Sequence, residues 1–180
     1  MTKTKPAVSV LLIITCVVVI SVAFHVHATS PPLIAANGPT SPCLGIRVQF
    51  TVTVTASNLT NVQSWQLNMT FDPQQARLMS YSVNSLFTGQ NTFGAVNNST
   101  SYFLYGLSLY NGHSPVTTTS QTTLITFTFK TLVYHGSDYF HIVTSTENTQ
   151  LGTMLLDPNQ NSQSYTTSDG YTGCQQRPSP

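Results

Sequence analysis

The side chains best suited to bind a transition metal gather in one short segment. His135, Asp138 and His141 lie within HGSDYFH, and zinc accepts both imidazole and carboxylate ligands. The first four residues have the composition of a turn, and three residues of extended chain span about 10 Å. The three side chains converge only if the chain folds back, so the sequence favours turn and strand-surface roles over a metal site.

A second segment begins like a calcium-binding loop. DPNQNSQSYTTSDG, residues 157–170, has Asp157, Asn159 and Asn161 at alternate positions. An EF-hand loop requires glycine at its sixth position and a bidentate carboxylate at its twelfth, and this segment has serine at both. The sequence therefore predicts a connector with a turn at its start and a last strand at residues 164–167, and it predicts no cofactor.

The few carboxylates of the chain give no sign of catalysis. Glycoside hydrolysis needs two carboxyl groups that face each other across a cleft. Asp72 and Asp169 occupy turn motifs, where hydrogen bonds to the backbone explain them. No serine has the context of a nucleophile elbow, and the sequence therefore predicts that the protein is not an enzyme.

Residues 1–28 have the pattern of a secretory signal. Lys3 and Lys5 precede an apolar run, and small residues precede a cleavage point after Ala28. The run is long enough to span a membrane, so membrane attachment is expected only through an uncleaved signal. The sequence predicts a protein that is secreted or held at the cell surface.

The exported chain carries very little charge. Four basic and five acidic residues follow Ala28, and this balance excludes a nucleic-acid-binding protein, which needs a basic patch. Ser, Thr, Asn and Gln make up 67 of the 152 residues after Ala28, so neutral polar groups provide the solubility. We hypothesise an extracellular protein that works in acid beneath a glycan coat. The candidate glycosylation sites are Asn58, Asn68, Asn97 and Asn98.

Two cysteines, Cys43 and Cys174, remain after the signal and bracket the predicted domain. An even pair in an exported chain predicts a disulfide. It would close a loop of about 130 residues, which in the chain-entropy model stabilises the fold by somewhat under about 5 kcal/mol. The pairing requires that both ends of the domain lie side by side.

Polar and apolar residues alternate along most of the chain between the two cysteines. Strict alternation in residues 46–55, 64–71 and 124–132 predicts strands with one buried face. Residues 92–96 and 102–109 are expected to form a hairpin. Short strands at regular spacing, without a helical period, predict an all-β protein with an antiparallel β-sandwich.

The predicted domain begins after a segment rich in proline and serine. Residues 29–43 are expected to be a linker, because Pro, Ser and Gly mark irregular structure. Residues 44–174 are expected to be the β-sandwich, and residues 175–180 a C-terminal tail.

Several segments together resemble a cohesin-type domain, over about residues 44–172. They are the run from Val48 through NLTNVQSWQLNMTFDP, then TLITFTFK, YHGSDYFHI and the closing SDGY. The chain is similar in character to secreted single-domain cohesin-like proteins of archaea. The resemblance implies a nine-stranded jelly-roll sandwich, related to carbohydrate-binding modules, with neighbouring termini and a binding function without catalysis.

The resemblance also implies where a partner would bind. In cohesins the outward polar residues before the Asp-Pro turn contact a dockerin, and the matching positions are Ser64 and Gln66, with Asn68 on the same predicted face. Family members commonly carry an Asn-x-Asp pair there, whereas both matching residues are neutral. The expected partner is an extracellular protein or a polysaccharide. Alternatives to a protein-binding module are a carbohydrate-binding module and a structural subunit of a surface layer or filament.

Tyrosine and phenylalanine side chains are numerous enough to include a sugar-stacking platform. A flat exposed ring packs on a pyranose face, whereas a core position with the hydroxyl at the rim explains a tyrosine equally well. Phe103 and Tyr105 share one face of a strand, opposite Tyr102. The pattern favours core and rim roles.

Overall fold

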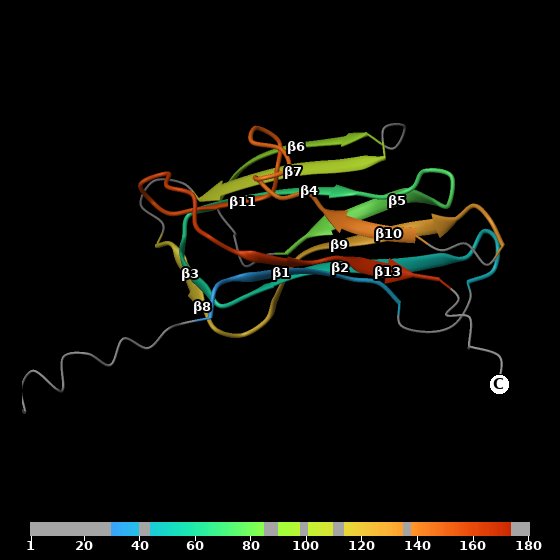
Figure 1. Ribbon diagram of the computed structural model, residues 1–180, viewed down its shortest axis with the longest axis horizontal. Coiled ribbons are helices and arrows are strands. Elements are labelled where there is room, and N and C mark those ends of the chain that lie inside the picture. The colour runs from blue at the N-terminus through green and yellow to red at the C-terminus, as the bar shows by residue number, and fades with distance from the viewer. Residues whose placement is uncertain are drawn as a thin grey trace, which may run out of the picture. The chain divides into compact units, whose positions relative to one another are not determined.

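Two facing sheets carry the alternating segments of this chain (Figure 1). A computed structural model describes residues 30–39, 44–84, 90–97, 101–109, 114–134 and 138–173, with the backbone alone for residues 90–97. Within these ranges there are thirteen strands and no helix, so the predicted all-β sandwich is confirmed, with more strands than the nine expected.

The first sheet has five strands. β1 is parallel to β12, and the other neighbours are antiparallel. In spatial order its strands are β12 (Thr166–Ser168), β1 (Leu33–Asn37), β2 (Gln49–Ser57), β9 (Thr122–Thr131) and β5 (Ala76–Val83).

The second sheet has six strands. In spatial order they are β13 (Gly170–Thr172), β10 (Asp138–Ile142), β4 (Ser64–Thr70), β7 (Tyr102–Leu109) and β6 (Gln90–Asn97), with β11 (Met154–Leu156) beside β4. β10 pairs with Thr70 and Met69 of β4, and β11 pairs with the earlier part of the same strand, from Gln66 to Ser64. Between β10 and β11 the chain leaves this sheet as a loop. β6 and β7 form the predicted hairpin. A separate pair consists of β3 (Leu59–Val62) and β8 (Val116–Thr118).

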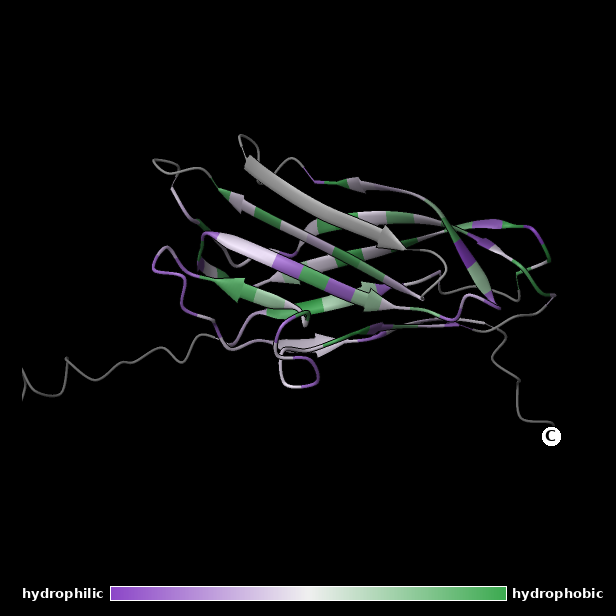
Figure 2. Cartoon of the chain, turned by 90° about the horizontal axis from the view of Figure 1, so that it is seen from above, coloured by the Kyte–Doolittle hydropathy of each residue, from purple (hydrophilic) through white to green (hydrophobic). Residues whose placement is uncertain are grey.

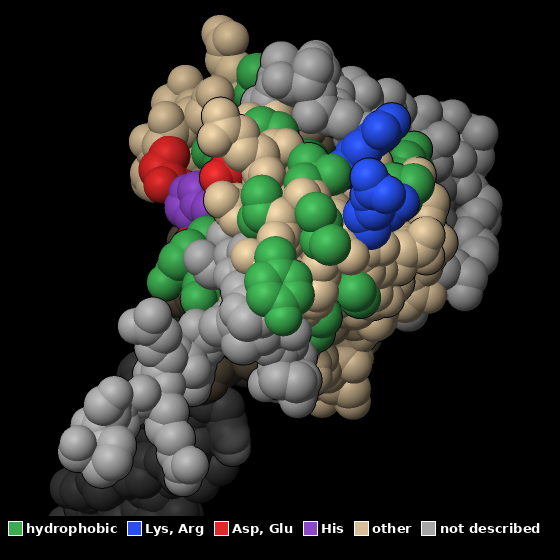
Figure 3. Space-filling model, turned by 90° about the vertical axis from the view of Figure 1, so that its right-hand side faces the viewer, with side chains coloured by type: hydrophobic (Ala, Val, Ile, Leu, Met, Phe, Trp, Pro, Cys, Tyr) green, Lys and Arg blue, Asp and Glu red, His purple; other side chains and the backbone are tan. Residues whose placement is uncertain are grey.

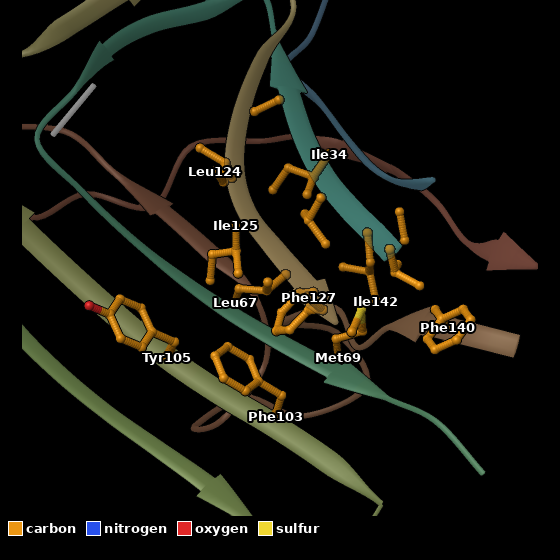
Figure 4. Packing of buried hydrophobic residues seen from close by; sticks show 14 of the residues in the cluster. Ile34, Leu67, Met69, Phe103, Tyr105, Leu124, Ile125, Phe127, Phe140 and Ile142 are labelled. Atoms are coloured by element: carbon orange, nitrogen blue, oxygen red, sulfur yellow. The ribbon is translucent and has the colours of Figure 1, made fainter. Parts of the chain in front are cut away.

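Inward side chains of both sheets form one hydrophobic core. Alternation along the strands is visible in Figure 2, and it turns each apolar face toward the other sheet. In Figure 4, Phe103 and Tyr105 of β7 face Ile125 and Phe127 of β9. The predicted inward residues of the second alternating segment are buried as expected, and they are Trp65, Leu67, Met69 and Phe71.

The N-terminal part of the domain differs from the prediction in two places. Leu33–Asn37, inside the expected linker, is strand β1, and its Ile34 is 1% exposed, so the linker interpretation is wrong for this segment. The strand expected from residue 46 begins at Gln49, because Arg47 has φ 62°, a left-handed conformation that interrupts an extended chain.

Some predictions concern residues that lie outside the described ones. They are the signal at residues 1–28, the tail at residues 175–180, both cysteines, His135 and Asn98. In the described part of the chain there is no helix of the length and hydrophobicity that a membrane crossing requires.

Candidate binding surface on the six-stranded sheet

The outward face of β4 is covered at the positions expected to bind a partner. Ser64 and Asn68 are each 7% exposed, and Gln66 is half-buried. Their neighbours along the strand point into the core as predicted, so the alternation is correct. These three residues do not form an open polar face, because Leu151 and Gly152 of the following loop accept hydrogen bonds from Asn68 and Gln66; a partner contact at these positions stays a prediction.

The covering loop, residues 144–152, is fixed to this face by two amide side chains. Asn68 Nδ2 donates a hydrogen bond to the carbonyl oxygen of Leu151 at 2.9 Å, and Gln66 Nε2 donates to that of Gly152 at 2.8 Å. A Cβ atom on Gly152 would lie 2.3 Å from the carbonyl oxygen of Thr144. Only glycine therefore allows the two ends of the loop to approach so closely.

A small groove of about 180 Å³ remains open beside the covering loop. Its outward side chains come from three neighbouring strands, because Ser64 pairs with Ser108 of β7 and with Leu156 of β11. Ser64 Oγ is buried and has no hydrogen-bond partner among the described residues, which is unusual for a buried polar atom. The groove is lined by Ser64, Trp65, Gln66, Leu107, Ser108, Met154, Leu156 and Gln160.

His141 joins the covering loop to the C-terminal strands. Its Nδ1 lies 2.7 Å from Asp169 Oδ2, and its Nε2 lies 3.0 Å from Glu147 Oε1 in the loop. The hydrogen bond to Asp169 and the charges of both carboxylates raise the pKa of His141. Hydrogen bonds from Thr144 lower the pKa of Glu147. The sequence offered no sign of this cluster, because Asp169 lies 28 residues from His141, and Glu147, six residues away, lies in a loop whose path the pattern does not define.

The strand geometry separates the residues that were weighed as zinc ligands. Asp138 is 3% exposed and faces inward, whereas His141 lies on the outward face of the same strand. Alternation places residues three apart on opposite faces of a strand. Among the described residues no group of three His, Cys, Asp or Glu side chains is arranged to hold a metal ion.

Asp138 is instead a buried acid. Its Oδ1 accepts a hydrogen bond from the backbone N–H of Asp72 at 2.9 Å, and its Oδ2 is buried with no partner in the part of the chain that the structure describes. Burial raises the pKa of Asp138 from 3.8 to about 7. The folded chain therefore keeps a proton between about pH 4 and 7 that the unfolded chain releases.

We expect the protein to become more stable as the pH falls from about 7 to 4. Where the native state binds more protons, the free energy of unfolding decreases as pH rises, by at most about 1.4 kcal/mol per pH unit for one group. Asp138→Asn keeps an acceptor for Asp72 and removes the titration, so its stability should change less over this range. Urea denaturation at each pH measures both. Equal pH profiles for the two proteins would contradict a raised pKa.

The segment that began like a calcium loop is a turn held by its first residue. Asp157 Oδ1 accepts hydrogen bonds from the backbone N–H groups of Asn159 and Asn161, both at 2.8 Å. Those bonds, with that of Asn161 first, lower the pKa of Asp157. The predicted turn is confirmed. The last strands are β12 and β13, so the chain continues as a strand after Asp169 instead of turning there.

Among the described residues, Tyr81 on β5 and Tyr134 after β9 are exposed singly, and two more exposed tyrosines form a pair on the outward face of β10 and β13. Tyr139 and Tyr171 are directly opposite each other, 67% and 37% exposed, with ring centroids 4.9 Å apart and planes at 53°. Rings at this angle do not form the flat platform that stacks on a sugar. Phe103 and Tyr105 belong to the core, as the pattern predicted.

Comparison with known proteins gives structural matches alone. No protein-family model and no curated protein matches the sequence. One similar structure is a non-cellulosomal cohesin from the hyperthermophilic archaeon Archaeoglobus fulgidus, with 17% identity, a TM-score of 0.60, and coverage of 81% of this chain and 91% of that one. The chain has the cohesin-type fold.

Bacterial cohesins match equally well. The second type II cohesin module from the cellulosomal adaptor ScaA scaffoldin of Acetivibrio cellulolyticus is 18% identical, with a TM-score of 0.62 and coverage of 83% of this chain and 99% of that one. A type I cohesin–dockerin complex from Clostridium thermocellum contains a match with 10% identity, a TM-score of 0.61, and coverage of 81% and 99%. The predicted resemblance to cohesins is confirmed at the level of the fold.

In this fold the candidate glycosylation sites differ in how accessible their side chains are to a glycosylating enzyme. Asn68 is buried and its Nδ2 is hydrogen-bonded, whereas Asn58 lies half-buried at the turn between β2 and β3, with φ 56°. An enzyme that glycosylates the folded chain should therefore modify Asn58 and leave Asn68 free. Intact mass should decrease for Asn58→Gln and not for Asn68→Gln. A glycan found at Asn68 would contradict the covered face.

Proposed function

We propose that this protein is a non-catalytic extracellular binding module of cohesin-type fold that attaches a protein partner at the cell surface. The observation that carries the proposal is the groove at Ser64 on the outward face of the six-stranded sheet. Its lining combines apolar side chains, among them Leu107, Met154 and Leu156, with neutral polar ones. Such a groove accepts an apolar side chain of a partner, while Ser108 and the exposed Gln160 in its lining can hydrogen-bond to the polar groups beside that side chain.

Two further features support an extracellular protein partner. The signal pattern at residues 1–28 directs export, and one structural match was solved as a cohesin–dockerin complex. The matching face of this chain offers Ser64 and Gln66 instead of a carboxylate, and the covering loop occupies Asn68. The partner should therefore recognise a neutral groove and not a charged strand.

A pull-down from the native cell surface tests the proposal. Ser108→Trp should fill the groove and reduce partner capture at least about tenfold, which corresponds to about 1.4 kcal/mol. The control Thr51→Trp adds the same ring to the exposed outward face of the other sheet and should leave capture unchanged. Equal capture by both variants would overturn the proposal, and retention on insoluble polysaccharide alone would favour the carbohydrate-binding alternative.

A further inference from the structure

Three basic side chains gather at one end of the five-stranded sheet. Arg77 and Lys130 are directly opposite each other on β5 and β9, and the backbone N–H of Arg47 donates a hydrogen bond to the carbonyl oxygen of Thr131 next to them. These three are the Lys and Arg residues of the described chain, and none has a carboxylate within 4.0 Å in that part. We call this group, with the apolar residues beside it, the cationic patch.

The apolar members of the cationic patch are unusually exposed. Ile46, Val48 and Leu132 are 52%, 40% and 38% exposed at the same end of the sheet. Figure 3 shows the Lys and Arg side chains next to one another among hydrophobic ones, with His and acidic side chains at the opposite side of this end. Arg77 and Lys130 are like charges directly opposite each other on neighbouring strands, an arrangement that destabilises a sheet. They are not needed for solubility, because neutral polar groups provide it. The position of the chain's few cations therefore indicates a contact.

A complementary surface lies on the other sheet. Tyr139 and Tyr171 are exposed on β10 and β13, and Glu147 and Asp169 flank His141 beside them. We call these five residues the anionic patch. Two carboxylates share one imidazole, so the patch has a net charge of about −2 when His141 is neutral and about −1 when it is protonated.

We propose that this protein associates head to tail, with the cationic patch of one copy docked on the anionic patch of the next. Exposed aromatic rings beside carboxylates suit arginine and lysine side chains, through cation–π contacts and ion pairs. The two patches are different surfaces of one chain. When two copies dock, one copy therefore still has a free cationic patch and the other a free anionic patch. A contact of this kind produces open filaments or rings. It gives a specific form to the structural-subunit alternative and does not depend on the groove at Ser64.

The charges make the association sensitive to salt and to pH. Exposed ion pairs contribute about 0–1 kcal/mol each and are screened at distances beyond about 8 Å in physiological salt. The groups that face His141 are Glu147 from the covering loop, Asp169 between β12 and β13, and the uncharged Thr70 on β4. Protonation of His141 halves the net charge of the patch, so association should weaken as the pH falls through its pKa.

Sedimentation velocity of the full exported chain tests the proposal at pH 8. In 50 mM salt the weight-average sedimentation coefficient should rise with concentration, and 500 mM salt should raise the dissociation constant at least about tenfold. Arg77→Glu/Lys130→Glu and Glu147→Gln/Asp169→Asn should each be monomeric alone. Mixed in equal amounts they should form a complex that stops at two chains, because only one intact pair of patches remains.

Matched controls separate docking from folding. Thr53→Glu/Thr126→Glu places carboxylates on the same outward face away from the cationic patch, and this variant should associate like the wild type. Thermal unfolding must show that each variant is folded. Wild-type protein that stays monomeric at low salt, a mixture of folded variants that forms no complex, or patches that bind only a different protein would each overturn the proposal.

Discussion

Replacing Phe129 with alanine is expected to lower the free energy of unfolding by about 3–5 kcal/mol, the range for fully buried aromatic side chains. Phe129 is 0% exposed and lies at the centre of the aromatic cluster between the sheets. Its ring centroid is 5.0 Å from those of Phe71 and Phe140 and 5.7 Å from that of Phe50. These partners come from three different strands or strand ends, so a cavity here would loosen both sheets.

The neighbouring threonine provides the control for this substitution. Thr128 lies on the outward face of the same strand, so Thr128→Ala should change the unfolding free energy by no more than about 0.5 kcal/mol. Urea denaturation measures both variants, and the denaturation midpoint should decrease clearly for Phe129→Ala alone. Similar midpoints for the two variants would show that the core is not centred on Phe129.

The sequence predicted the long strands because the signal for them is local. Alternation along β2, β4 and β9 records which face of each strand is buried, and Phe127 and Phe129 are buried as the pattern requires. β1 carried no such signal, because its five residues follow two prolines and become a strand by pairing with β2 and β12. Short strands depend on partners that are distant in the sequence, and composition alone classed this one as a linker.

The candidate site was predicted less well, for a related reason. Alternation correctly placed Ser64, Gln66 and Asn68 on the face opposite the core, but it could not show that another segment covers that face. The hydrogen bond between Asn68 and Leu151 joins residues 83 positions apart. His141 and Asp169 are 28 positions apart, and only the pairing of β10 with β13 brings them together. Contacts of this range are set by the fold and not by a motif.

Replacing both Cys43 and Cys174 with serine is expected to lower the free energy of unfolding by about 2–5 kcal/mol, because the disulfide would restrict a loop of about 130 residues in the unfolded chain. The described segments just before the two cysteines run in contact. A Cβ atom on Gly38 would lie 2.7 Å from the carbonyl oxygen of Tyr171, and one on Gly170 would lie 2.9 Å from that of Ala36. Backbones this close bring the flanks of both cysteines to the same edge of the domain.

Reduction and mass spectrometry together test the linkage. Reductant should lower the melting temperature of the wild type and leave that of the double serine variant unchanged, so the variant controls for other effects of the reductant. A peptide map of the unreduced protein should contain Cys43 joined to Cys174. Two thiols that react with an alkylating reagent in the native protein would contradict the disulfide. In that case the contact of β1 with β13, and not a covalent bond, would hold the two ends of the domain together.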